Sequence, residues 1–350
     1  MSFAQFMELA LYAPGLGYYA GGAAKFGAVG DFITAPEMTP LFGRTLAQTA
    51  LLVLHETGGD ILELGAGSGR LALDLLRELE TRQAFPMQYR ILEVSPDLQA
   101  RQRALFETEA PHLLGRLVWL DRLPASFTGL ILANEVLDAM PVHLVHWLNG
   151  EVFERGVIDH AGEFAWQDRL LLEGPLRQAA CAIDPGLDYL SEINLAAPAW
   201  LNSLAQCLQR GVILCLDYGF PRNEYFHSQR DSGTLRVHYR HHSLDDPFYL
   251  PGLCDLTAHV DFSAVANAAV ESGLDLLGYT SQANFLLNAG LLDLMQTMTP
   301  GNADYLRAAA AVQKLLQPSE MGELFKAIAF GRGVTPDLHG FQRGDRRGAL

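Results

Sequence analysis

The glycine turn at residues 65–69, Gly-Ala-Gly-Ser-Gly, constrains the fold of this chain more than any other stretch. It follows a short apolar segment at 60–64 and precedes 69–80, where leucines recur at helical spacing. Glycines at alternate positions allow a sharp turn and leave no Cβ atom between the backbone and a ligand. The turn therefore predicts a strand–turn–helix unit of a parallel α/β sheet.

Strand-like and helix-like patterns alternate along most of the chain, as in a doubly wound, mostly parallel sheet with helices on both faces. Short apolar runs predict the strands, and apolar residues that recur every three or four positions predict the helices. The expected strands are 60–64, 89–94, 117–120, 129–133, 212–216, 274–279 and 326–330. The expected helices are 2–12, 40–57, 69–80, 96–107, 198–209 and 262–272, with a longer helical segment at 282–317.

Two stretches interrupt this α/β alternation. After Pro141, three strand-like segments follow one another, separated by Asn149-Gly150 and Ala161-Gly162, which favour hairpin turns. We therefore expect residues 142–195 to form an antiparallel insertion. Residues 220–254 are polar and aperiodic and predict a loop insertion. The remaining segments are an N-terminal part, 1–58, and the α/β core at 59–141, 196–219 and 255–332.

Charge and composition exclude some classes of protein. The 350 residues include 25 basic and 40 acidic side chains, for a net charge of -15, whereas nucleic-acid binding requires a basic face. We therefore expect no nucleic-acid partner; the acidic balance suits a cationic ligand or a basic partner protein, or serves solubility alone. No apolar run reaches about 18 residues, so no membrane insertion is expected. The four cysteines lack metal-ligand spacing and no signal peptide is evident, which predicts no metal and a bacterial cytoplasmic location.

The spacing of the glycines distinguishes two kinds of nucleotide ligand. A dinucleotide fingerprint, G-x-G-x-x-G, requires a third glycine at position 70, which is Arg70 here. The observed spacing, with an acid two places before the first glycine, resembles the first motif of class I methyltransferases, which bind S-adenosyl-L-methionine. The alternative is a turn that only joins a strand to a helix. We expect this cofactor, with S-adenosyl-L-homocysteine as its product, to contact Glu63, Gly65, Ala66, Gly67 and Gly69.

Acidic residues also follow the next two strands. Glu93 ends the second strand, where a carboxylate can accept hydrogen bonds from both ribose hydroxyls of a nucleoside. The alternative is a solvated acid at a strand end. Asp121 follows the third strand and is a weaker candidate for contact with the adenine, since an acid there is as often a simple turn residue.

The fourth and fifth strands end in further polar residues, at the sheet edge where ligands of open α/β sheets bind. Asn134, Glu135 and Asp138 follow the fourth strand, and Asp217 follows the fifth. Carboxylates there attract a sulfonium and orient a nitrogen nucleophile. We expect Asn134 to contact the cofactor and the three acids to act in catalysis. The alternatives are a helix N-cap cluster at 134–138 and a polar strand-to-loop transition at Asp217.

An ordered set of motifs ties the glycine turn to one family. The motifs lie at 30–37, 134–141, 216–219, 233–236, 255–262 and 282–286. Together they resemble the MidA family of methyltransferases, whose mitochondrial members act in respiratory complex I assembly and methylate arginine in a core subunit. The resemblance extends from about residue 6 to residue 330.

This resemblance implies a class I methyltransferase core with family-specific insertions. It also implies that residues 30–37 fold over the cofactor, so that Asp31, Thr34 and Pro36 contact it. By analogy with protein arginine methyltransferases, residues 257–259 line the acceptor side and His259 acts in catalysis. Those enzymes clamp the guanidinium with two glutamates. Here Glu135 is one candidate, and the second acid must be Asp138 or lie elsewhere.

The favoured hypothesis is direct displacement on the cofactor methyl by a protein nitrogen, with arginine as substrate implied by the resemblance alone. Two rivals remain at this point. One is a cofactor-binding assembly chaperone with little catalysis, in which the insertions bind partners. The other is a nicotinamide oxidoreductase. The histidines at 227, 238, 241 and 242 fit a polar loop better than a metal site.

Overall fold

A central sheet dominates the computed structural model, which describes residues 1–21, 34–183, 185, 188–240 and 242–350. Among these residues its strand order is β14-β15-β9-β4-β1-β2-β3, and β13 (Val260–Asp261) pairs with β9. Every strand is parallel to its neighbours except β15, which is antiparallel to both β14 and β9. The other strands are β1 (Asp60–Leu64), β2 (Tyr89–Leu92), β3 (Leu117–Leu120), β4 (Phe127–Asn134), β9 (Leu208–Phe220), β14 (Asp275–Ser281) and β15 (Phe325–Arg332).

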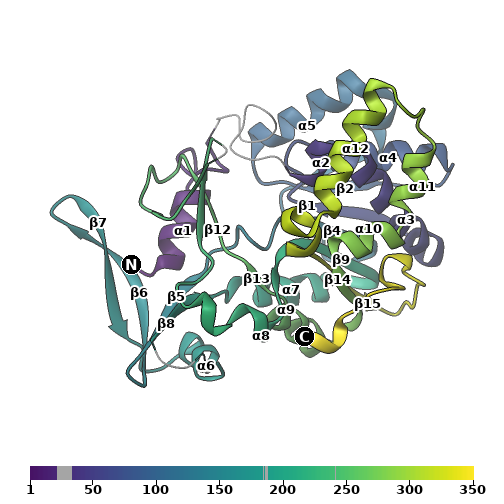
Figure 1. The fold of residues 1–350 in the computed structure, drawn as a ribbon. Helices are drawn as coiled ribbons and strands as arrows, with labels where there is room; N and C mark the ends of the chain where they lie inside the picture. The colour runs from purple at the N-terminus through teal and green to yellow at the C-terminus, as the bar shows by residue number, and fades with distance from the viewer. Residues whose placement is uncertain (22–33, 184, 186–187, 241) are drawn as a thin grey trace.

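Helices cover both faces of this sheet, because its central strands are apolar on both sides. One face packs against α3 (Pro40–Thr57), α4 (Arg70–Thr81) and α12 (Ala303–Leu316), and the other against α7 (Ala196–Cys207) and α9 (Phe262–Glu271). The predicted fold class, a doubly wound and mostly parallel sheet, is confirmed (Figure 1). The remaining helices near the sheet are α2 (Ala35–Met38), α5 (Pro96–Glu109), α10 (Gln282–Asn288) and α11 (Leu291–Gln296).

The helical segment expected at 282–317 consists of three helices in the structure, α10, α11 and α12. Gly290 adopts φ +90 between the first two helices, and Pro300-Gly301 precedes the third. A left-handed glycine ends one helix and lets the chain start the next in a new direction.

The antiparallel insertion is confirmed and forms a separate sheet of order β7-β6-β5-β8. The two predicted hairpin turns are present, with positive φ at Asn149, Gly150, Ala161 and Gly162. Strand β8 was not predicted. The helix α1 (Phe3–Tyr12), capped by Ser2 as expected, packs against this sheet to one side of the α/β core (Figure 1). The elements are β5 (His143–Leu148), β6 (Glu151–His160), β7 (Glu163–Leu170), α6 (Pro175–Cys181) and β8 (Tyr189–Ile193).

Residues 220–254, predicted as a loop, contain regular structure. Strand β10 (Arg236–Tyr239) pairs with β11 (His242–Leu244) and with β12 (Asp255–Thr257). Val237 is fully buried opposite Leu256, but strands of three and four residues are too short to show alternation in the sequence. The chain also forms α8 (Arg222–Tyr225) here. Throughout the described part of the chain, every helix is too short or too polar to cross a membrane.

Candidate functional site

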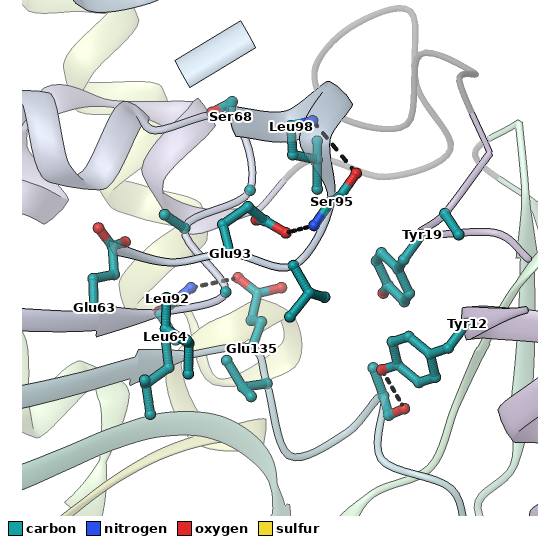
Figure 2. Close-up of a pocket in the computed structure, with 18 of the residues that line it drawn as sticks. Tyr12, Tyr19, Glu63, Leu64, Ser68, Leu92, Glu93, Ser95, Leu98 and Glu135 are labelled. Atoms are coloured by element: carbon teal, nitrogen blue, oxygen red, sulfur yellow. Dashed lines mark hydrogen bonds between the residues drawn. The ribbon is translucent and has the colours of Figure 1, made fainter. Parts of the chain in front are cut away.

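A cavity of about 540 Å³ opens at the carboxyl ends of β1, β2 and β4. This is the edge at which parallel α/β sheets bind their ligands. Figure 2 shows side chains from the strand ends on one side of this cavity and from the N-terminal segment on the other. Of the residues predicted to contact a cofactor, the lining includes Glu63, Gly65, Ala66, Gly67, Glu93, Asn134, Thr34 and Pro36.

The glycine turn forms the floor of the cavity between β1 and α4. Gly65, Gly67 and Gly69 all have positive φ, at 66, 52 and 85, which favours glycine at each position. A Cβ atom on Gly65 would lie 3.1 Å from Val136 Cγ2. Gly69 does not line the cavity; it is the N-cap of α4, so its place in the motif is structural.

Glu63 lies in β1 immediately before the turn. Its side chain is buried and accepts a 2.7 Å hydrogen bond from the Tyr89 hydroxyl to Oε2. Burial raises the pKa of Glu63 to about 7. Glu63 is therefore anchored to the neighbouring strand, and it contributes to the cavity wall from this fixed position.

Hydrogen bonds orient the Glu93 carboxylate on the cavity wall. The Ser95 N–H donates to Oε1 at 2.9 Å, and Gln102 Nε2 donates to Oε2 at 3.3 Å. Gln102 also donates to the Gly67 carbonyl at 2.9 Å and accepts from Trp119 Nε1 at 2.8 Å. Gln102 thus links the predicted ribose acid to the glycine turn.

Gln102 was missed by the sequence analysis, although a signal was present. It is fully buried on the same stripe of α5 as Leu98 and Phe106, one polar residue in an otherwise apolar row. Buried polar side chains usually have specific hydrogen-bond partners. By contrast, Asp121 is exposed and does not line the cavity, so the structure gives no support to its predicted contact with the adenine.

Replacing Gln102 by Met is expected to weaken binding of S-adenosyl-L-homocysteine by roughly tenfold, because Glu93 loses the side-chain donor to its Oε2 and keeps the Ser95 N–H at Oε1. Stability should fall by about 1–3 kcal/mol, since Trp119 Nε1 and the Gly67 carbonyl lose their partner. Titration calorimetry and chemical denaturation measure the two effects. Gln99→Met is the matched control: Gln99 donates to the backbone carbonyl of Glu93, at 2.7 Å, and not to its carboxylate, so affinity should stay near wild type. Equal losses in both variants would contradict this role for Gln102.

Glu135 projects into the cavity from the end of β4 because its backbone is left-handed, with φ +52. Such a conformation costs a non-glycine residue energy and is often found at functional sites. Its Oε1 accepts hydrogen bonds from Asn134 Nδ2 at 3.1 Å and from the Ala35 N–H at 3.4 Å. Burial, together with the nearby charge of Asp138, raises the pKa of Glu135 to about 8.

Asp138 and Asp217 occupy different places, although both were predicted to be catalytic. Asp138 is buried, lines the cavity and accepts a hydrogen bond from Tyr218; burial raises its pKa to about 6. Asp217 does not line the cavity. Its Oδ2 accepts the N–H groups of Val136 and Leu137, at 3.0 and 2.8 Å. Asp217 therefore stabilises the turn that carries Glu135 and Asp138 and does not itself face the cavity.

His259 also lies outside the cavity, contrary to the expectation that it faces the acceptor. It lines a separate hollow of about 260 Å³ with Arg230 and Arg236. Its ring packs edge-on against Tyr218, with the centroids 5.2 Å apart. Burial and the neighbouring cations lower the pKa of His259 to about 4. A neutral imidazole separated from Asp138 by Tyr218 is not placed to accept a proton in the cavity.

The segment predicted to cover the cofactor reaches the cavity at Thr34 and Pro36, whereas Asp31 lies outside the described residues. Two contacts fix this end of the segment. Glu37 accepts a hydrogen bond from the Ser68 hydroxyl of the glycine turn, and the Ala35 N–H contacts Glu135. Residues 34–37 therefore connect the turn to the acidic residue after β4.

The lining also includes residues that were not predicted as part of the site, among them Tyr12, Tyr19 and Asp255. The two rings stack with centroids 5.5 Å apart and an interplanar angle of 19°. The only sequence signal was the abundance of aromatic residues after α1, which does not say where those residues pack. With Asp255, the described part of the lining holds five carboxyl groups and no Lys, Arg or His, which favours cationic ligands.

Comparison with known proteins identifies the family. Residues 41–280 match the family described as "Putative S-adenosyl-L-methionine-dependent methyltransferase". This chain belongs to that family. A crystal structure of a "likely methyl transferase" from Burkholderia thailandensis, bound to S-adenosyl-homocysteine, is 48% identical with a TM-score of 0.96, covering 100% of this chain and 92% of the other. The predictions of a methyltransferase and of S-adenosyl-L-methionine as its cofactor are confirmed.

Curated relatives extend the comparison to eukaryotes. The Drosophila melanogaster protein named "Protein arginine methyltransferase NDUFAF7 homolog, mitochondrial" is 29% identical, over 95% of this chain and 81% of its own. The Homo sapiens protein named "Protein arginine methyltransferase NDUFAF7, mitochondrial" is 28% identical, over 93% and 79%. The similarity spans the methyltransferase core and both insertions, so it concerns nearly the whole chain.

The residues of this cavity suit the cofactor in their chemistry. The glycine turn leaves no Cβ atom in the way of a nucleoside, and Glu93 beside it would accept hydrogen bonds from vicinal hydroxyls. The acidic residues after β4 would attract a sulfonium.

Proposed function

We propose that this enzyme methylates an arginine nitrogen of a protein substrate. The observation that carries the proposal is the acidic cavity, whose described lining has five carboxyl groups and no cationic side chain. A guanidinium is a cation with several N–H donors, and carboxylates bind it through charge-assisted hydrogen bonds. The names of the relatives, protein arginine methyltransferases in both flies and humans, support the same substrate class.

The mechanism assigned to these residues is direct displacement. Glu93 and the glycine turn fix the nucleoside, and the bound cofactor supplies a methyl group on its sulfonium. Glu135 and Asp138 accept hydrogen bonds from the guanidinium and align one nitrogen for in-line attack. The nitrogen forms a bond to the methyl carbon while the carbon–sulfur bond breaks, and one proton leaves the nitrogen. With a pKa above about 12, the free guanidinium does not release that proton readily, so a carboxylate beside it accepts the proton as the bond forms.

Comparative mass spectrometry of cells with and without the gene tests this substrate class. Loss of the enzyme should abolish methylation at one or a few arginine sites and leave other methylated residues unchanged. Restoring the wild-type gene should restore those sites, and restoring a Glu135→Gln gene should not. An unchanged set of methylated arginines, or a loss confined to lysine or to a small molecule, would contradict the proposal.

The affinity for S-adenosyl-L-methionine should rise with pH relative to that for S-adenosyl-L-homocysteine. The pKa of Glu135 is raised to about 8 and that of Asp138 to about 6, so both become charged as the pH rises from about 6 to about 9. Only the substrate cofactor carries a positive sulfur, so the ratio of the two affinities isolates this attraction. We expect a change of roughly tenfold by calorimetry.

Glu135→Gln should remove most of the pH dependence of this affinity ratio. A ratio that stays constant with pH in the wild type would contradict the prediction.

The stability of the ligand-free protein should follow the opposite trend with pH. Because these folded-state pKa values lie above their unfolded values, the stabilisation is complete at low pH and is lost as the pH rises through about 8. Thermal unfolding over the same pH range measures this loss.

A further inference from the structure

We propose that Tyr12, Tyr19 and Asp255 form the acceptor clamp of the enzyme, a subsite that selects a planar cation. The inference rests on the proposed function for its biological substrate, but its chemistry can be tested separately. Figure 2 shows the two tyrosine rings side by side across the cavity from Glu93 and Glu135. The clamp therefore stands opposite the residues that hold the nucleoside and faces the acids after β4.

Hydrogen bonds fix each member of the clamp. The Tyr19 hydroxyl donates to Asp255 Oδ1 at 3.1 Å, and the Tyr12 hydroxyl donates to the Ala139 carbonyl at 2.9 Å. Ala139 directly follows Asp138, so Tyr12 is tied to the acidic turn itself. Asp255 is buried and lines the same cavity. One ring is thus bonded to the turn after β4 and the other to β12.

The backbone that carries the two rings is also well defined. Tyr19 lies in the chain that returns along α1, where its N–H donates to the Leu11 carbonyl at 2.8 Å. The turn between the rings depends on Gly17, where a Cβ atom would lie 2.5 Å from the Ala13 nitrogen. Asp255 begins β12, which is paired with β10. A clamp built on a helix end and a strand is rigid enough to discriminate by shape.

The chemistry of the three side chains matches a guanidinium better than an ammonium. A planar guanidinium can stack on an aromatic face and still direct its N–H groups at carboxylates in its own plane. An ammonium is more strongly hydrated and cannot satisfy both contacts in that way. Burial and the charge of Asp255 raise the pKa of both tyrosines, so the hydroxyls keep their protons and the clamp keeps its shape.

The clamp adds a third acid, Asp255, to Glu135 and Asp138, the two that accept hydrogen bonds from the guanidinium in the proposed mechanism. Asp138 lies three residues from Glu135 on the same turn, so the two approach a ligand from one side. Asp255 comes from a different sheet and is coupled to an aromatic ring. A cation between them would meet carboxylates from two directions and an aromatic surface from a third.

Equilibrium binding of butylguanidinium and butylammonium to the enzyme saturated with S-adenosyl-L-homocysteine tests the clamp. We expect the wild type to bind butylguanidinium roughly tenfold more tightly by NMR titration. Asp255→Asn should weaken binding of both cations roughly tenfold. Tyr12→Leu and Tyr19→Leu should remove the preference for the planar cation. Affinity for S-adenosyl-L-homocysteine should stay within about twofold in each variant, which separates loss of the clamp from misfolding.

Tyr18→Phe is the matched control, since Tyr18 lies in the same turn, packs edge-on against Tyr19 and is not part of the described lining. It should retain wild-type binding of both cations. Tyr19→Phe keeps the ring and should retain part of the preference even if Asp255→Asn folds poorly. Equal binding of the two cations by the wild type, or unchanged binding in Asp255→Asn, would overturn the clamp. If cation selection is found but cells show no loss of arginine methylation, the biological substrate is wrong and the clamp stands.

Discussion

Glu135→Gln is expected to lower kcat by at least about a hundredfold while leaving the affinity for S-adenosyl-L-homocysteine within about twofold. The amide keeps the size of the side chain and its hydrogen-bonding oxygen, so the contacts with Asn134 and Ala35 can persist. It carries no charge to align a guanidinium and cannot take up its proton. Steady-state kinetics with a methyl-accepting protein, combined with calorimetry, measures the two quantities.

Asp121→Asn provides a control for this substitution. Asp121 is an exposed acid after β3 that does not line the cavity, so neither turnover nor affinity should change. Turnover by Glu135→Gln within about threefold of wild type would remove Glu135 from the mechanism. A large loss of S-adenosyl-L-homocysteine affinity in that variant would instead assign Glu135 to cofactor binding.

Glu93→Ala is expected to weaken S-adenosyl-L-homocysteine binding by roughly a hundredfold. The substitution removes both acceptors for the ribose hydroxyls, and hydrogen bonds to a charged group contribute about 1.5–3 kcal/mol each. At saturating S-adenosyl-L-methionine, turnover should recover most of its value, because Glu93 does not contact the reacting atoms in this account. Calorimetry gives the affinity, and initial rates over a range of cofactor concentrations separate KM from kcat.

Asp97→Ala serves as its control, since Asp97 lies nearby in the first turn of α5 but is partly exposed and pairs with Arg101. The affinity of Asp97→Ala for S-adenosyl-L-homocysteine should remain at the wild-type level. An affinity loss below about fivefold in Glu93→Ala would show that Glu93 is not the ribose acid.

The sheet and the sites at its strand ends could be predicted because their signals are local. Each signal lies within one short stretch of sequence, where an apolar strand is followed directly by the glycine turn or by an acid such as Glu93, Glu135 or Asp138. Parallel topology then places all strand ends on one edge. The order of the strands was not predicted, since pairing between distant strands such as β9 and β15 leaves no mark within either one.

The direction in which each side chain points could not be predicted from position alone. Glu135 directly follows β4, and its left-handed backbone turns its side chain into the cavity, whereas Asp217, expected after a strand, lies within β9. Asp217 instead accepts backbone N–H groups beneath the same turn. His259 was assigned by analogy to the acceptor side, and the packing of Tyr218 separates it from there.

The acceptor clamp was missed for a different reason. Tyr12 and Asp255 lie far apart in the sequence and come together because α1 packs against the insertion sheet and β12. Neither residue belongs to a pattern that marks a site within its own segment. Gln102 is an intermediate case. As one polar residue in the buried stripe of α5, it could be identified from the sequence as a residue with specific partners, but only the structure shows that one partner is Glu93.

Transfer of a labelled methyl group in vitro tests the central claim most directly. Proteins from cells that lack the gene are incubated with methyl-labelled S-adenosyl-L-methionine and either the wild-type enzyme or Glu135→Gln, and the protein fraction is then hydrolysed to amino acids. We predict label in methylarginine with the wild type and almost none with the variant. Label in another amino acid, or equal labelling of arginine by the two enzymes, would contradict the account.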